Sequence, residues 1–214
     1  SRRLIIVPGL LGALVIALAA LITAVAYTGD IGQAYSPFNH FISELGHTEQ
    51  SERAWLFNLA LIISGLSFLL FMEGVGMKLR GIARQVIATS STITGIAGAL
   101  VGVFPVNEDL QAHQTMAGLF FLGALIMLVC FALAVGLGKN SPYPRWLALA
   151  ALPMILSSAL FIFLVLTGGE NALAPPEGAR EPFWIAAVSE WGALIFLLVW
   201  IAALTIWQIA HPDR

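Results

Sequence analysis

Six long apolar segments constrain the fold of this sequence more than any other feature. They cover residues 4–27, 54–77, 82–104, 113–137, 145–167 and 183–209. A helix needs about 20 apolar residues to cross the hydrocarbon core of a membrane, and each segment is long enough. The segments are continuously apolar rather than alternating, and lipid offers no partners to the open edge of a sheet. We therefore predict an all-α polytopic membrane protein, with a single six-helix transmembrane domain over residues 1–214.

The composition supports a membrane protein and argues against a nucleic-acid partner. The chain is 59% hydrophobic and only 10% charged, whereas soluble domains carry about 25% charged residues. Its net charge of −2 provides no basic surface for nucleic acid. The expected partners are membrane lipids and other membrane subunits. Residues 4–27 exceed the apolar core of a signal peptide, so we expect a retained first helix.

The basic residues predict the orientation of the chain. Most of them fall at the ends and in the second and fourth links, namely Arg2, Arg3, Lys78, Arg80, Arg84, Lys139, Arg145 and Arg214. The remaining links hold only Arg53 and Arg180. The positive-inside rule then places both termini in the cytoplasm, and the even number of helices agrees. The acidic first, third and fifth links are expected on the outer side.

The first outer link contains the densest group of chemically active side chains. Phe38, Phe41, Ile42 and Leu45 recur at helical spacing, which predicts a short interfacial helix over residues 38–46. On such a helix His40 and Glu44 share a face, and His47 follows three residues after Glu44. Two imidazoles and a carboxylate would then lie together.

A second group of polar residues is expected on the same side of the membrane. Asp109 precedes His113 by four residues, and Asn58 lies near the start of the second helix. Glu190 would lie about 10 Å inside the last helix at 1.5 Å per residue. A carboxylate at such depth costs about 2.5–3.5 kcal/mol and must find a partner. The complete candidate cluster is His40, Ser43, Glu44, His47, Asn58, Asp109, His113 and Glu190.

Three interpretations of this cluster remain open. In the first, Asn58 and Glu190 hydrogen-bond to the loop backbone and stabilise the fold. In the second, the cluster binds a lipid head group or a small ligand. In the third, His40, His47 and His113 hold a metal, with zinc the candidate, in a metal-dependent lipid hydrolase. No motif such as His-Glu-x-x-His requires a cofactor, and whether the protein is an enzyme is left open. A structural accessory subunit of a larger membrane complex is a further alternative.

Three features concern the helices and the last outer link. Thr, Ser, Gly and Ala dominate the segment 82–104, which predicts a tightly packed central helix that does not face lipid. Pro153 should kink the fifth helix. The link 168–182, with Pro175 and Pro176, is expected to be a plain loop or a mobile flap.

Several short motifs resemble those of a known family. The segment Asn39–Gly46 resembles an "N-x-I-S-[ED]-L-G" loop, Trp55–Asn58 an "lFN" helix start, and Gly102–Pro105 with His113 a "G-x-F-P…H" link. Glu190 falls where the family has "ER", although Trp191 here replaces the arginine. The set resembles the bacterial and archaeal six-helix membrane family catalogued as domain of unknown function 998. The loop is also similar to that of the eukaryotic Frag/DRAM/Sfk group, which is linked to lipid remodelling and autophagy. The resemblance implies the fold and a prokaryotic cytoplasmic membrane, but no reaction.

Overall fold

The structure is a computed structural model that describes residues 2–29, 31–168 and 180–212. The described residues form helices and connecting segments without a named strand. The elements are α1 (Arg2–Val25), η1 (Ile42–Gly46), α2 (Ala54–Gly76), α3 (Gly81–Val103), α4 (Leu110–Gly136), α5 (Arg145–Ala150), α6 (Leu152–Gly168) and α7 (Ile185–Ala210). Six spans are long and apolar enough to cross a membrane, with α5 and α6 together forming the fifth. The predicted all-α fold is therefore confirmed.

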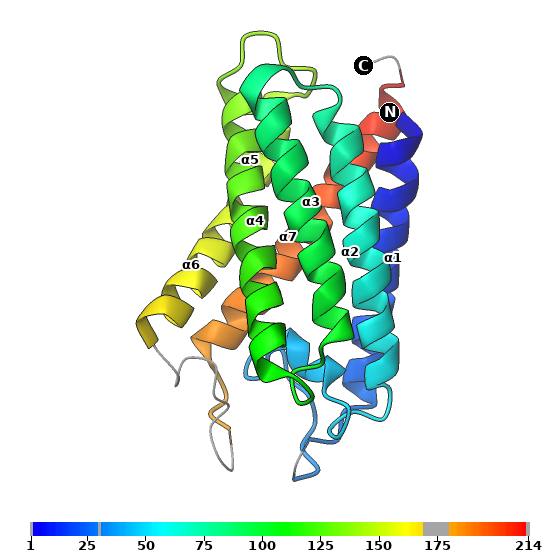
Figure 1. The fold of residues 1–214 in the computed structure, drawn as a ribbon, viewed down its shortest axis with the longest axis vertical. Coiled ribbons are helices and arrows are strands. Elements are labelled where there is room, and N and C mark those ends of the chain that lie inside the picture. Colours follow the sequence, from blue (N-terminus) through cyan, green and yellow to red (C-terminus); the bar gives the residue numbers. More distant parts are fainter. Residues whose placement is uncertain (1, 30, 169–179, 213–214) are drawn as a thin grey trace.

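The fifth span bends as Pro153 predicts. The helix is interrupted at Ala151, which separates α5 from α6. A proline at position 153 has no N–H to donate to the carbonyl of residue 149, and its ring crowds that turn. Beyond the bend, α6 diverges from α4 as both approach the end of the bundle that holds η1 (Figure 1). The expected loop or flap over 168–182 lies largely outside the described residues, which resume at Arg180.

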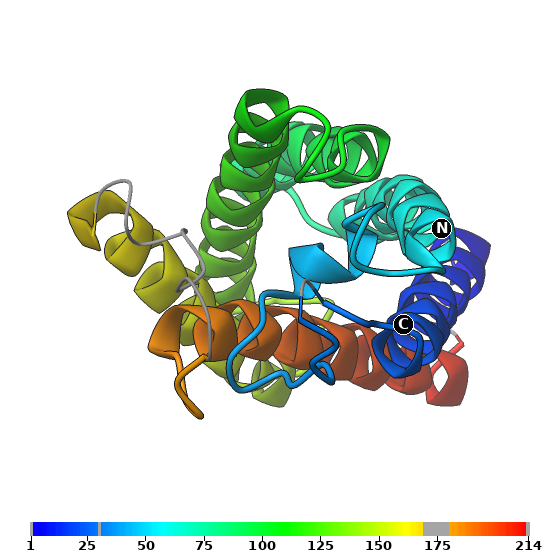
Figure 2. The same ribbon diagram turned by 90° about the horizontal axis from the view of Figure 1, so that it is seen from below.

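The helices form a closed ring in chain order. Each helix packs against the next, α4 contacts both α5 and α6, and α7 returns to α1. Viewed along the bundle, η1 lies inside this ring at one end (Figure 2). It contacts α1, α2 and α7. We call this end of the bundle the η1 end. The first residues of α1 and the last of α7 lie together at the opposite end (Figure 1).

The small residues of α3 pack as expected on one side only. Gly65 of α2 approaches so closely that a Cβ built there would lie 2.6 Å from the Gly95 carbonyl oxygen. Close approach of this kind is how glycine contributes to membrane helix packing. However, Ile93, Ile96 and Val103 on the other side of α3 are exposed. The prediction that α3 avoids lipid is therefore wrong, because a ring leaves every helix with an outward face.

Candidate functional site

Helix side chains hold both ends of η1 by its backbone. The Ile42 N–H donates to Glu190 Oε2 at 2.7 Å, and Asn58 Nδ2 donates to the Gly46 carbonyl oxygen at 3.0 Å. Glu190 and Asn58 are both buried. Glu190 lies five residues after the start of α7, or about 8 Å along the helix. The first of the three interpretations of the cluster expected hydrogen bonds from these two side chains to the loop backbone, and the structure contains them. Such bonds are required where backbone groups lie near lipid.

The segment 38–46 differs from the predicted interfacial helix. Residues 37–40 form a turn, and only Ile42–Gly46 are helical, as a tight 3-10 helix. Tyr35 stabilises this shape because its hydroxyl donates to the Phe41 carbonyl oxygen at 2.8 Å. The hydroxyl in turn accepts from Trp191 Nε1 at 2.8 Å. The α-helical face that would have joined His40, Glu44 and His47 therefore does not form.

Glu44 forms a buried ion pair that the sequence analysis did not predict. Its Oε1 accepts from Arg180 Nη1 at 2.9 Å, and its Oε2 accepts from Arg180 Nη2 at 2.6 Å. The two side chains are only 8% and 7% exposed. The same carboxylate accepts from the Phe41 N–H at 2.8 Å. The Tyr27 hydroxyl lies 3.2 Å from Glu44 Oε2 and 2.9 Å from Gln50 Oε1, so its one hydrogen is shared between them. Arg180 also donates to the Asn39 carbonyl oxygen at 3.0 Å, so it joins the chain before α7 to the first loop.

His40 is enclosed by aromatic rings and is not arranged as a ligand. Its ring centroid lies 5.3 Å from that of Tyr27 and 5.1 Å from that of Tyr35. Burial lowers the pKa of His40 below its ordinary value; nearby Arg180 lowers it further, while Glu44 opposes the shift. Its buried Nε2 has no hydrogen-bond partner among the described residues. These contacts indicate a packed neutral imidazole.

The remaining predicted residues are distributed over separate structural roles. Asp109 caps α4 by accepting from the Ala112 N–H at 2.9 Å. His113 Nδ1 lies 2.8 Å from the Phe104 carbonyl oxygen. His47 Nδ1 accepts from the Glu49 N–H at 3.3 Å, in a local turn. Ser43 is half-buried beside Glu44.

The three histidines are therefore not gathered around one point. Over the described ranges, no group of three or more His, Cys, Asp or Glu side chains is placed to hold a metal ion. The hypothesis of a metal held by His40, His47 and His113 is wrong in its geometry, because each ring is engaged in a different local contact. The zinc-dependent hydrolase has no support from these residues.

Three residues of the predicted cluster instead line a cavity between α4 and α6. This outer cavity has a volume of about 370 Å³. Apolar side chains form most of its wall, and the polar side chains are Ser43, His113, Gln114 and Glu190. Leu122 and Leu166 at its edge are exposed, at 49% and 78%. The opening therefore faces sideways from the bundle, where a membrane would place acyl chains.

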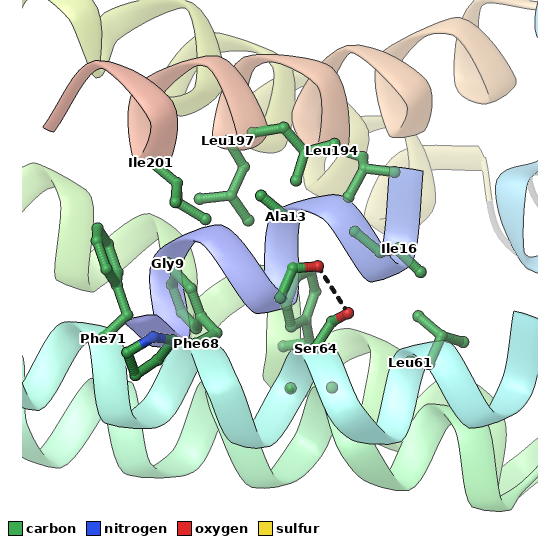
Figure 3. Close-up of a pocket in the computed structure, with 16 residues that line it drawn as sticks. Gly9, Ala13, Ile16, Leu61, Ser64, Phe68, Phe71, Leu194, Leu197 and Ile201 are labelled. Carbon is green, nitrogen blue, oxygen red and sulfur yellow. Dashed lines mark hydrogen bonds between the residues drawn. The ribbon is translucent and has the colours of Figure 1, made fainter. Parts of the chain in front are cut away.

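Two smaller cavities lie inside the ring, and the middle one shares lining residues with each of the other two. The middle cavity, of about 80 Å³, shares Ser43, His113 and Glu190 with the outer one. The inner cavity, of about 70 Å³, lies between α1, α2 and α7 (Figure 3). Its one hydroxyl, that of Ser64, donates to the Gly12 carbonyl oxygen at 2.9 Å. Polarity therefore falls from the outer cavity to the inner one.

Sequence reasoning missed Arg180 and the walls of the cavity. Arg180 could have been found, because it is one of only two basic residues assigned to the predicted outer links, which hold most of the acids. The cavity could not, because it depends on the angle at which α6 leaves the bundle. Apolar wall residues such as Phe121 and Phe161 carry no distinguishing pattern.

Comparison with known proteins gives one match. No curated protein and no solved structure matches the chain. The sequence profile of one family, described as "Protein of unknown function (DUF998)", matches residues 10–207 and thus nearly the whole chain. With its six apolar spans, the protein is a multi-pass integral membrane protein that belongs to the DUF998 family.

Proposed function

We propose that this protein binds a membrane amphiphile in the cavity between α4 and α6. The single observation that carries the proposal is the form of this cavity. It opens sideways between two spans, its walls are apolar, and its polar groups gather at the η1 end. Ligand sites are commonly apolar cavities with a few placed polar groups. An amphiphile has the same division, because its tail is apolar and its head group is polar.

The surroundings of the site support this proposal. Polar and ionisable groups inside a membrane are costly and commonly mark functional sites. Glu190 accepts the hydrogen bond from the Ile42 N–H that holds η1 in place, and it also lines the cavity. We place the protein in the cytoplasmic membrane of a prokaryotic cell, with membrane lipids as partners. The excess of basic residues at the terminal end supports a cytoplasmic position for both termini.

The proposal can be tested with a variant that fills the cavity. Gly118 lines the outer cavity, and a Cβ built there meets nothing within 4 Å. Gly118→Phe should therefore occupy the cavity without disturbing the packing. Leu119→Phe is the matched control, because Leu119 is 41% exposed on the same helix and is absent from the cavity wall.

The measurement is lipid extraction from protein purified in mild detergent, followed by mass spectrometry against the total membrane lipid. The parent and Leu119→Phe should retain one class of amphiphile above its share in the membrane, and Gly118→Phe should lose it. Retention of lipids in bulk proportions by all three proteins would refute the proposal. A protein partner recovered in stoichiometric amount, with no enriched lipid, would favour the accessory-subunit alternative.

A further inference from the structure

Three side chains define the polar end of the proposed ligand site. Ser43, His113 and Glu190 each line both the outer and the middle cavity. They come from the η1 segment, α4 and α7 respectively. We call them the head-group cluster. The inference below rests on the proposed function and concerns the chemistry of the head group that this cluster accepts.

His113 contributes a hydrogen-bond acceptor to the cluster. Its Nδ1 lies 2.8 Å from the Phe104 carbonyl oxygen. A carbonyl oxygen can only accept, so Nδ1 must carry the hydrogen of this bond. In a neutral imidazole the other nitrogen, Nε2, then carries a lone pair. The fixed tautomer therefore makes Nε2 an acceptor.

Glu190 contributes hydrogen-bond acceptors, and it adds negative charge when it is ionised. Its Oε2 accepts from the Ile42 N–H at 2.7 Å, and the Ser43 backbone N–H is a second donor to the carboxylate. A carboxylate has about four lone-pair positions, so two backbone donors leave about half of its accepting capacity unused. An amphiphile that donates to it would compensate for the cost of the buried charge.

Among the residues that the structure describes, neither the outer nor the middle cavity is lined by a Lys or Arg side chain that could balance an anionic head group. Arg180 lines neither cavity, and its guanidinium donates to Glu44 and to the Asn39 carbonyl oxygen. The lining side chains that could donate a hydrogen bond to an anionic head group beside Glu190 are then the Ser43 hydroxyl and the exposed Gln114 amide.

We propose that the ligand is an amphiphile whose head group donates hydrogen bonds, either a hydroxyl or a primary amine, and that anionic amphiphiles are rejected. The donor lies against Glu190 and His113. The alkyl chain runs along the wall formed by Phe121, Leu122, Phe161, Ile162 and Val165. Hydroxyl and ammonium groups can both donate hydrogen bonds to the acceptors of His113 and Glu190, and the ammonium group also compensates the charge of an ionised Glu190.

The test uses three photoreactive probes that differ only in the head group. Each has a hexadecyl chain with a diazirine, ending in a hydroxyl, a primary amine or a carboxylate. The parent protein is labelled in phosphatidylcholine nanodiscs at about pH 9, where the amine probe is protonated and the carboxylate probe is ionised. Peptide mass spectrometry then measures labelling in residues 110–122 and 161–166.

The hydroxyl probe, the amine probe or both should label these segments at least about tenfold more than the carboxylate probe, a ratio equivalent to ~1.4 kcal/mol. Labelling by the hydroxyl probe alone identifies an alcohol, and labelling by the amine alone identifies a cationic amphiphile. Equal or stronger labelling by the carboxylate would overturn the inference while leaving the cavity as a ligand site. Labelling spread evenly over all lipid-facing helices by all three probes would instead overturn the proposed function.

Glu190→Gln removes the charge while retaining an oxygen that can accept from the Ile42 N–H. In this variant the carboxylate probe should gain labelling and the amine probe should lose it. Glu73→Gln on α2 is the matched control, since Glu73 lies near the opposite end of its helix and outside both cavity walls. The Glu73→Gln protein should be labelled by the three probes in the same order of intensity as the parent. The comparison of probes on the parent needs no variant, so the inference remains testable even if Glu190→Gln does not fold.

Discussion

Replacing Arg180 by alanine should destabilise the η1 end of the protein severely. The guanidinium gives Glu44 two short hydrogen bonds, of 2.9 and 2.6 Å, in a pair that is less than a tenth exposed. Without it, the carboxylate still accepts from the Phe41 N–H and the Tyr27 hydroxyl, and the hydroxyl also bonds to Gln50. Removing one partner of a buried ion pair typically costs about 3–5 kcal/mol, because the other charge is left uncompensated.

The size of this loss can be checked in a series of variants. Arg180→Lys keeps the charge but cannot make both bonds in parallel, so it should lose about 1.5–3 kcal/mol, the contribution of one charged hydrogen bond. Glu44→Gln combined with Arg180→Ala should be more stable than Arg180→Ala alone, since no buried charge is then left without its partner. This recovery separates the ion pair from general damage to the loop.

The assay is thermal unfolding in detergent, followed through the reaction of a maleimide dye with Cys130. Cys130 is the one cysteine of the chain and is partly buried on α4, so it reports loss of helix packing. For a chain of this size, 3–5 kcal/mol corresponds to a fall in melting temperature of roughly 6–20 °C. Arg53→Ala is the control, because Arg53 is exposed at the same end. An Arg180→Ala protein that melts within about 2 °C of the Arg53→Ala protein would refute the reasoning.

Three other predictions follow from single contacts. Gly65→Ala should lower the free energy of unfolding by about 1–3 kcal/mol, since its Cβ would lie 2.6 Å from a backbone oxygen, whereas Gly118→Ala should be neutral or stabilising by up to ~1 kcal/mol; equal melting temperatures for the two variants would contradict the predicted difference. Asn58→Ala should cost about 1–3 kcal/mol in the same melting assay by leaving the buried Gly46 carbonyl without its donor. Because the pKa of His40 is lowered on folding, the unfolded chain binds the extra proton, so stability should fall as the pH drops below about 6.5; melting between about pH 7.5 and 5.5 should show a smaller fall for His40→Gln than for the parent.

The sequence predicts a contact where the apolar membrane restricts a polar group to partners within the protein. Asn58 and Glu190 were expected to hold the loop backbone, because lipid provides no alternative partners, and they do. The bend near Pro153 follows from the missing N–H in the same way. These predictions depend on local chemistry and not on the arrangement of distant elements.

The parts that could not be predicted depend on relative positions of distant segments. Glu44 and Arg180 are 136 residues apart in the chain, and no spacing rule connects them. Pro153 gives the position of the bend but not the direction in which α6 leaves the bundle. His40 and His47 would have shared a face only on a regular α-helix, whereas residues 37–46 form a turn followed by a 3-10 helix.

Glu190 both stabilises the loop and lines the cavity, so its variants must be chosen to separate these two roles. Glu190→Ala removes the acceptor for the Ile42 N–H together with the charge that faces the cavity. A loss of ligand in that variant could follow from a displaced η1 alone. Glu190→Gln changes the charge and keeps an acceptor, whereas Asn58→Ala weakens the other end of η1 without touching either wall that Glu190 lines. A ligand preference that changes in the first variant and not in the second would therefore belong to the carboxylate itself.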